Sequence, residues 1–255
     1  MNKLLSVIAC VAALMSTSVV AKEVRLASDF TYPPFNYKNS DGVPVGFDIE
    51  IADALCAQAK LDCVWVSQGW DALIPSLLSR KSDVIMASMR ITEERKKKIL
   101  FTNKYYQTPA RFVAQASSSF TIDKTGLNGK VIGVQQGTIH DRYVTDKFGD
   151  VAEIKRYTGQ DEVYIDMANQ RLDATFGNSD QLALAFLDTK QGDGFEFKGE
   201  AVTDKAYIGE GTALALRQQD TELAEKFNQA IVAIRENGTY DKIASKYFTF
   251  DIYGD

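Results

Sequence analysis

The sequence predicts an α/β protein of two lobes that close on a ligand. Short segments rich in β-branched residues alternate with segments whose apolar residues recur at helical spacing, which is the pattern of sheets covered by helices. The alternation restarts near residue 111, and 255 residues are enough for two small domains. Because no linker rich in proline, glycine or serine separates the two series, we expect strands to join the lobes as a hinge.

The first series contains three predicted strands and two predicted helices. The strands are expected at residues 24–28, 63–67 and 83–88, with a proline-containing loop at 29–36. One helix starts after Gly46, because Phe47, Ile51 and Leu55 recur at helical spacing. The other helix opens at residues 70–71 and is expected to bury Leu73, Leu77 and Leu78.

The second series supplies most of the remaining elements. Its strands, with a final return strand, are expected at residues 111–115, 130–135, 153–157, 173–176 and 213–217. A helix capped by Thr138 follows the second of these strands, and another helix follows the third. A long helix from Asp220 or Thr221 to Gly238 and a short helix at 240–247 complete the chain.

The N-terminus predicts export. Lys3, an apolar stretch at residues 4–14 and small residues at 19–21 form a secretory leader, for which we expect cleavage after Ala21 and release into the periplasm. The alternative is a lipoprotein cleavage box at residues 7–10, which is less consistent with an apolar run that continues past it. The net charge of −5 argues against a nucleic-acid partner.

Removal of the leader leaves two cysteines, Cys56 and Cys63. An even number in an exported chain favours a disulfide, and the alternative is a pair of buried free thiols. The chain has no Cys-x-x-Cys motif, so a bridge here would be structural.

Few residues of the sequence are candidates for catalysis or for cofactor binding. A single histidine, His140, excludes a metal site with several histidines, and no phosphate-binding loop, dinucleotide fingerprint or Gly-x-Ser-x-Gly motif occurs. We therefore expect a binding protein with neither metal nor cofactor, not an enzyme.

Candidates for ligand recognition lie at strand ends. Asp29 and Tyr32 follow the first strand and Trp70 precedes a helix, and ligands of open α/β sheets bind beyond the carboxyl ends of strands. A carboxylate beside aromatic rings suits a guanidinium or ammonium group. The alternative interpretation is an aspartate that caps a turn beside two core aromatics.

A complementary group for a carboxylate is also present. The fork of Arg95 can bind an α-carboxylate, whereas the lysines at 96–98 are typical of a surface helix. Thr138 and the amides after Gly137 can add donors from a helix N-terminus. His140 is expected either on the surface of the first helical turn or in contact with the ligand.

Across these motifs the chain resembles a known family, the amino-acid-binding proteins of bacterial ABC importers, particularly the lysine/arginine/ornithine, histidine and arginine binders. The resemblance runs from about residue 24 to 255. It is carried by Tyr-Pro-Pro-Phe at 32–35, Val-Gly-Phe-Asp-Ile at 45–49, Trp-Asp-Ala-Leu-Ile-Pro-Ser-Leu at 70–77, Ile-Thr-Glu-Glu-Arg at 91–95 and Asn-Gly-Thr-Tyr-Asp-Lys-Ile at 237–243.

The resemblance implies the type II periplasmic binding protein fold, in which two hinge strands join the lobes. Lobe I would comprise residues 22–108 and 205–255, and lobe II residues 109–204. The chain would be a monomer that captures a basic amino acid, with arginine favoured over lysine, ornithine or histidine, and delivers it to an inner-membrane ABC permease. The spacing of Cys56 and Cys63 also matches a disulfide of these proteins.

The resemblance also assigns roles to residues. In the basic-amino-acid binders the position of Asp29 holds the cationic tip of the ligand, those of Tyr32 and Trp70 sandwich its methylenes, and that of Arg95 clasps the α-carboxylate. The other positions expected in the pocket are Ala87, Ser88, Arg90, Thr138, Ile139, His140 and Asn178.

Two positions depart from the family pattern. Arg90 stands where the family usually has Ser or Asp near the α-ammonium, and Asn178 stands where it usually has Asp, although Asp180 lies two residues on. Either Arg90 turns away from the ligand, or the ligand carries a substituent on its α-nitrogen, as opines do. A remote alternative is an enzyme of the cyclohexadienyl dehydratase type.

Overall fold

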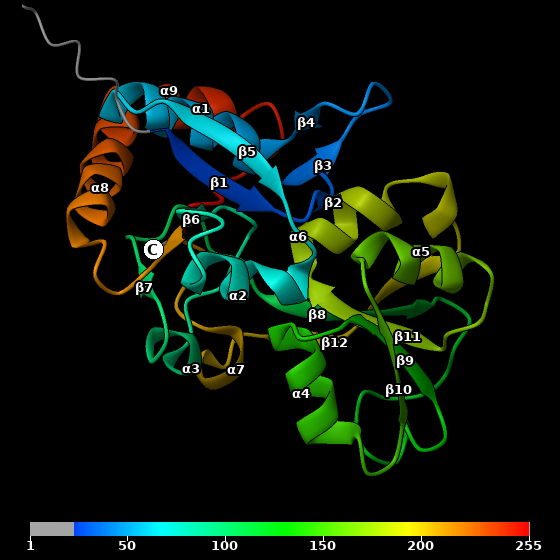
Figure 1. The fold of residues 1–255 in the computed structure, drawn as a ribbon. Coiled ribbons are helices and arrows are strands. Elements are labelled where there is room, and N and C mark those ends of the chain that lie inside the picture. Colours follow the sequence, from blue (N-terminus) through cyan, green and yellow to red (C-terminus); the bar gives the residue numbers. More distant parts are fainter. Residues whose placement is uncertain (1–22, 255) are drawn as a thin grey trace, which may run out of the picture.

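The strands form two five-stranded sheets in separate halves of the molecule (Figure 1). The computed structural model describes residues 23–254, so the predicted leader at 1–21 lies outside the described residues. We call the half built on the first sheet lobe I and the half built on the second sheet lobe II. The predicted α/β architecture of two sheets is confirmed.

The first sheet has the strand order β5-β1-β6-β13-β7. Its strands are β5 (Cys63–Ser67), β1 (Val24–Ser28), β6 (Val84–Ile85), β13 (Ala215–Leu216) and β7 (Leu100–Phe101). β1 is parallel to β5 and β6, whereas β13 is antiparallel to β6 and β7. Because β13 comes from the last fifth of the chain, lobe I combines both ends of the sequence.

Helices cover both faces of the first sheet because consecutive strand residues point to opposite sides. Leu26 packs into the core beneath α1, α8 and α9, and the next residue, Ala27, packs against α2 on the other face. The helices are α1 (Phe47–Ala59), α8 (Thr221–Glu236), α9 (Thr239–Ala244), the short η1 (Trp70–Ala72) and α2 (Leu73–Leu78).

The second sheet has the order β10-β9-β11-β8-β12. Its strands are β10 (Glu153–Tyr157), β9 (Val131–Gln135), β11 (Ala174–Asn178), β8 (Ala110–Gln115) and β12 (Phe195–Val202). Phe112 packs with α4 (Ile139–Phe148) on one face, and Val113 packs with α5 (Gln160–Ala168) on the other. Both faces of this sheet are therefore buried as well.

The chain crosses between the sheets twice, between β7 and β8 and again between β12 and β13. Thr212 forms isolated β-bridges with Arg90 and with Tyr106, so the two crossings lie side by side. The short helix α7 (Lys205–Ile208) contacts α4 of lobe II. The lobe boundaries stay a prediction, and we propose that the return crossing begins after α7 instead of at residue 205.

The remaining elements are short. A small sheet beside lobe I contains β2 (Thr31–Tyr32), β3 (Asn36–Lys38) and β4 (Pro44–Val45). Four further turns of helix are α3 (Glu93–Lys96), α6 (Ser179–Leu182), η2 (Ala183–Leu187) and η3 (Lys190–Gly192). Within residues 23–254 no helix is both long and apolar enough to span a bilayer.

Several expected elements differ from the observed ones. The strand expected at 83–88 is confined to β6, because the backbone turns at Ser88 with a φ of 52°. Leu78 is 49% exposed, since it lies about 100° around α2 from the buried Leu77. The predicted loop at 29–36 contains β2, and the edge strand β12 was not predicted at all.

The disulfide between Cys56 and Cys63 is confirmed, and the alternative of free thiols is wrong. Its sulfur atoms are 2.05 Å apart, and the Cα atoms are 6.3 Å apart. The bridge joins the last turn of α1 to the first residue of β5.

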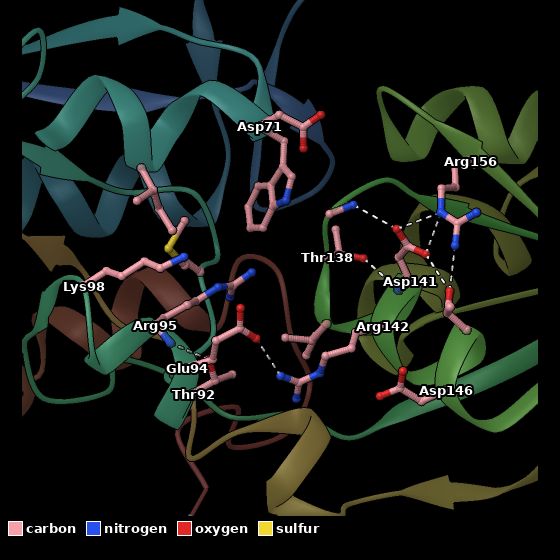
Figure 2. Close-up of a pocket in the computed structure, with 16 residues that line it drawn as sticks. Asp71, Thr92, Glu94, Arg95, Lys98, Thr138, Asp141, Arg142, Asp146 and Arg156 are labelled. Atoms are coloured by element: carbon pink, nitrogen blue, oxygen red, sulfur yellow. Dashed lines mark hydrogen bonds and ion pairs between the residues drawn. The ribbon is translucent and has the colours of Figure 1, made fainter. Parts of the chain in front are cut away.

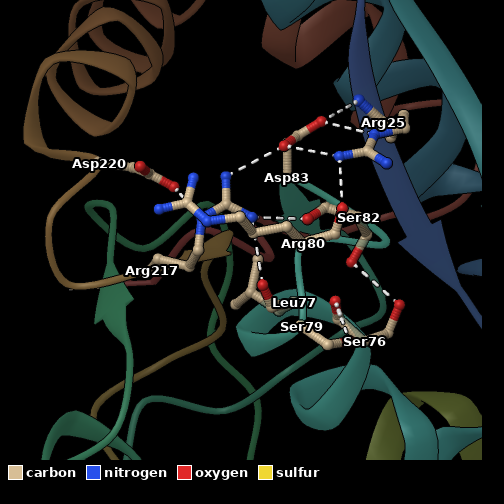
Figure 3. A network of polar contacts seen from close by, with 9 residues as sticks. All are labelled: Arg25, Ser76, Leu77, Ser79, Arg80, Ser82, Asp83, Arg217 and Asp220. Atoms are coloured by element: carbon tan, nitrogen blue, oxygen red, sulfur yellow. Dashed lines mark hydrogen bonds and ion pairs between the residues drawn. The ribbon is translucent and has the colours of Figure 1, made fainter.

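An ion network around the buried Asp83 ties three strands of lobe I together (Figure 3). Asp83, which precedes β6, accepts from Arg25 Nε at 2.8 Å and from Arg217 Nη2 at 3.0 Å. Burial raises the pKa of Asp83, but the hydrogen bonds from the two guanidinium groups outweigh burial and bring the pKa to about 2. The carboxylate thus stays charged between residues that follow or belong to β1 and β13.

Candidate functional site

All eleven residues predicted to contact a ligand line one cavity between the lobes. Lobe I contributes Asp29, Tyr32, Trp70, Ala87, Ser88, Arg90 and Arg95, and lobe II contributes Thr138, Ile139, His140 and Asn178. The cavity volume is about 30 Å³, which is room for two or three water molecules. An amino acid therefore needs the lobes or side chains to move apart before it can enter.

Asp29 and Tyr32 lie just beyond the carboxyl end of β1. Asp29 Oδ2 accepts from Thr31 Oγ1 at 3.0 Å and from Gln135 Nε2 of lobe II at 3.1 Å. Burial raises the pKa of Asp29, while these hydrogen bonds act in the opposite direction. Because a cation would further favour the ionised form, this carboxylate is suited to a positively charged ligand group. Burial likewise raises the pKa of Tyr32, which stays a neutral phenol.

Trp70 and Arg95 lie together in lobe I. The Arg95 guanidinium carbon is 5.4 Å from the centroid of the Trp70 ring, a cation–π contact. Arg95 Nη1 donates to the carbonyl of Arg90 at 3.0 Å. Burial lowers the pKa of Arg95 to about 10, with a smaller contribution from neighbouring arginines, so the group keeps its charge at neutral pH. Its remaining N–H groups suit a carboxylate.

Arg90 is oriented toward the hinge. It is only 4% exposed, and its Nη2 donates to the Thr108 carbonyl at 2.7 Å and to Thr108 Oγ1 at 2.6 Å. Its guanidinium carbon lies 5.7 Å from the centroid of the Tyr106 ring. One side of the guanidinium is therefore engaged by the first crossing, although the residue still lines the cavity.

The lobe II side chains mainly cap helices. Thr138 Oγ1 accepts from the amide of Asp141 at 3.1 Å and donates to the Gln135 carbonyl at 2.8 Å, so its hydroxyl is already used. Asn178 Oδ1 accepts from the amides of Asp180 and Gln181 at the start of α6. Thr138 is thus the predicted N-cap of α4, and its hydroxyl is not free to bind an anion.

His140 lines the cavity from the first turn of α4, and its contact with the ligand stays a prediction. Its ring contacts Phe176 edge-on at 5.6 Å. Burial, aided by the charges of Arg90 and Arg95, lowers the pKa of His140 to about 3. The imidazole is therefore neutral and can accept as well as donate a hydrogen bond.

Polar atoms with unused hydrogen-bonding capacity surround the cavity. Three cavity residues each carry a buried atom with no hydrogen-bond partner within residues 23–254: Asp29 Oδ1, Arg90 Nη1 and His140 Nε2. Another such atom, close in sequence to Asn178, is Asp180 Oδ2. Asp180 does not line the cavity, and burial raises its pKa to about 6 despite the opposing charge of Arg90. Buried polar groups are normally satisfied, so this set indicates a site that binds a polar ligand.

Gln135 is a cavity residue that the sequence interpretation missed. It is the last residue of β9, and its amide bridges Asp29 of lobe I and the Thr158 carbonyl at 3.1 Å each. Its place at the carboxyl end of a parallel strand is the signal that could have identified it.

A second, larger cavity of about 430 Å³ adjoins the first and shares Trp70, Arg95, Thr138 and Ile139 with it (Figure 2). Two contacts between the lobes border it. Glu94 Oε2 accepts from Arg142 Nη1 at 3.1 Å, and Gln136 Nε2 donates to Asp71 Oδ2 at 3.0 Å. Charged side chains therefore line the mouth of the cleft, and the predicted recognition residues lie in the smaller cavity.

Metal chemistry receives no support from the side chains. Among the described residues, no three His, Cys, Asp or Glu side chains are grouped in a way that could hold a metal ion.

Comparison with known proteins gives one consistent result. The chain is 46% identical over 241 residues to the L-arginine-binding protein of Pseudomonas aeruginosa, covering 94% of this chain and 93% of that one. It is 39% identical to the lysine/arginine/ornithine-binding periplasmic protein of Escherichia coli, covering 95% and 94%. A Salmonella typhimurium periplasmic binding protein studied for high arginine specificity superposes with a TM-score of 0.82 at 29% identity, covering 90% of this chain and all of that one.

The family comparison covers nearly the whole described chain. The model for "Bacterial extracellular solute-binding proteins, family 3" matches residues 24–250. The relatives are binding proteins by name, which confirms the expectation of a binder in place of an enzyme. With two sheets, a cleft between them and this match, the chain belongs to family 3 of the bacterial extracellular solute-binding proteins.

Proposed function

We propose that this protein is the periplasmic solute-binding component of an ABC importer and that its ligand is a basic amino acid, L-arginine above all. The observation that carries the proposal is the Asp29 carboxylate, which lines the cavity with one oxygen unpaired within the described residues. Tyr32 and Trp70 line the same cavity, and Arg95 provides the opposite charge. The names of the similar proteins support arginine.

In this proposal the ligand spans the charges of the pocket. Its guanidinium donates to Asp29, its methylenes pack against Tyr32 and Trp70, and its α-carboxylate accepts from Arg95. His140 and the amides at the start of α4 add polar contacts from lobe II. The guanidinium and the α-carboxylate of the ligand then each meet a fixed opposite charge away from water, where hydrogen bonds to ions are strongest.

Capture proceeds by closure of the lobes. The ligand first binds the lobe I residues, and rotation about the two crossings then brings Gln135 and His140 over it. The contacts between lobes at Asp71 and Glu94 form in the same movement. A ligand that contacts both lobes shifts the population toward the closed form by its differential affinity for that form. The closed form would then dock on an inner-membrane permease as a monomer, after removal of the leader at Ala21.

Isothermal titration calorimetry with L-arginine, L-lysine, L-ornithine and L-histidine tests the proposal. Arginine should bind tightly, because its guanidinium can donate to the unpaired Oδ1 of Asp29 in a charge-assisted hydrogen bond. Failure of all four amino acids to bind would refute the assignment.

A second candidate ligand is an amino acid substituted on its α-nitrogen, as in opines. Arg90 favours it, since its Nη1 is buried without a partner in the described chain and would suit an additional carboxylate. If this candidate is correct, Arg90→Ser weakens binding of the substituted ligand. Tighter binding by Arg90→Ser would contradict it.

A further inference from the structure

A carboxylate is completely buried beneath the pocket. Asp48, in the first turn of α1, is 0% exposed. It accepts from Tyr105 Oη, from Asn36 Nδ2 and from Ser88 Oγ, each at 2.8 Å. All three donors are neutral, so hydrogen bonds alone compensate for the loss of hydration.

Such an arrangement is costly for a residue with no purpose beyond packing. Burial raises the pKa of Asp48 to about 6 although the three hydrogen bonds act against the shift. A buried ion without a counter-ion stabilises a fold less than an apolar residue of similar size would. The position of its partners indicates what the carboxylate does.

One partner of Asp48 belongs to the pocket itself. Ser88 lines the cavity, and its backbone is left-handed, with a φ of 52°. A residue with a Cβ adopts this conformation at a cost of about 1 kcal/mol, so something must hold it there. The hydrogen bond from Ser88 Oγ to Asp48 does so, and the turn it fixes places Ala87 and Arg90 on the cavity wall.

Asp48 also connects to the segment that carries the other lobe I residues of the pocket. Ser28, which precedes Asp29, donates to Asn36 Oδ1 at 2.9 Å, and Asn36 donates to Asp48. The amide of Asp48 in turn donates at 2.7 Å to the carbonyl of Phe35, the last residue of the Tyr-Pro-Pro-Phe motif. Asp48, within the Val-Gly-Phe-Asp-Ile segment at 45–49, thus contacts both pocket segments of lobe I.

We propose that Asp48 is a positioning residue for ligand binding, which acts through Ser88 by holding its left-handed turn in place. The inference rests on the proposed function, because it requires a ligand in the cavity that Ser88 lines. It assigns the Ser88 hydroxyl to the protein's own carboxylate, not to the ligand.

Two substitutions of Ser88 distinguish a hydroxyl that holds the turn from a hydroxyl that contacts the ligand. Ser88→Gly removes the hydroxyl but accepts a positive φ without strain, whereas Ser88→Ala removes it and keeps the strain. If the hydroxyl serves to hold the turn, Ser88→Ala weakens L-arginine binding about tenfold and Ser88→Gly less than about threefold. If the hydroxyl contacts the ligand directly, both variants lose the same affinity, which would overturn the inference.

The role of Asp48 is tested by Asp48→Asn in the wild-type chain and in the Ser88→Gly variant. An asparagine at this position turns an N–H group toward donors, so Asp48→Asn should weaken L-arginine binding about tenfold in the wild-type chain. In Ser88→Gly the same change should alter the dissociation constant less than about twofold, since the link is already removed. An equal loss in both backgrounds would overturn the inference. Should Asp48→Asn fail to fold, the comparison of the two Ser88 variants decides alone.

Ser76→Ala is the matched control. Ser76 is a buried serine of α2 whose hydroxyl meets Ser82 Oγ at 3.4 Å, outside the contacts of Asp48. It should leave the affinity for L-arginine unchanged. Absence of binding by the wild-type protein would contradict the proposed function, whereas binding by the wild type with equal losses for Ala and Gly at residue 88 would contradict this inference alone.

Discussion

Replacement of the Asp29 carboxylate by an amide should remove most of the selectivity for a cationic ligand. Asp29→Asn keeps the size of the side chain and an oxygen that can still accept from Thr31 and Gln135, the two donors seen at Oδ2. What it removes is the negative charge beside the unpaired Oδ1 described above. The substitution therefore tests the charge and leaves the shape of the pocket largely intact.

The magnitude follows from the burial of this group. Loss of one partner from a desolvated, hydrogen-bonded charge pair costs about 2–5 kcal/mol. The lower part of that range applies, because Asp29 retains some exposure to the cleft and the amide oxygen of its neutral replacement still accepts from Thr31 and Gln135. A loss of about 3 kcal/mol corresponds to an increase in the dissociation constant of about 150-fold.

Calorimetry with two ligands isolates the effect of charge. L-Arginine and its uncharged isostere L-citrulline are titrated into the wild type and into Asp29→Asn. The wild type should strongly prefer arginine, and the variant should bind both with similar affinity. Asp71→Asn is the control, because Asp71 is an exposed lobe I carboxylate that contacts Gln136 outside the smaller cavity. Arginine binding by Asp29→Asn within threefold of the wild type would refute the reasoning.

Three further predictions concern the framework. Replacing both Cys56 and Cys63 by serine should lower the free energy of unfolding by about 2.5 kcal/mol, as expected for the loop the bridge closes; a loss below about 1 kcal/mol in urea titrations would contradict this. Glu94→Gln removes the exposed ion pair with Arg142 and should weaken arginine binding only about twofold, with the difference abolished in 1 M salt; a tenfold loss in calorimetry would be inconsistent with it. The pKa of Asp83 is depressed to about 2, so its contribution to the free energy of unfolding is complete above about pH 4 and is lost as the pH falls through 2. Asp83→Asn should therefore lower the free energy of unfolding by about 3 kcal/mol at pH 7. It should also flatten the decrease of this free energy at acid pH.

Local patterns in the sequence identified most of the framework. The short apolar runs of β1 and β8 and the helical spacing in α1 and α8 are properties of short segments, so they could be predicted without tertiary information. β12 is harder to predict, because the alternation of Phe195 and Phe197 with charged residues is short and stops at Gly199, and the strand is irregular where it pairs with β8 at the sheet edge. Its pairing with a strand 80 residues earlier defines it.

Some residues of the candidate site could likewise be predicted from local sequence, and others could not. Asp29 and Arg95 could be selected because charged residues beyond strand ends suggest ligand contacts. The hydrogen bonds between Gln135 and Asp29 and between Asp48 and Ser88 join residues 106 and 40 positions apart, and no local pattern reveals such pairings. The direction of Arg90 also depended on the fold, since Thr108 and Tyr106 of the hinge hold its guanidinium.

A crystal structure of the protein with L-arginine tests the central claim most directly. We expect the ligand between the lobes, with its guanidinium hydrogen-bonded to Asp29 and its α-carboxylate to Arg95. A ligand bound in the opposite direction, or bound outside the cavity that these two residues line, would contradict the account.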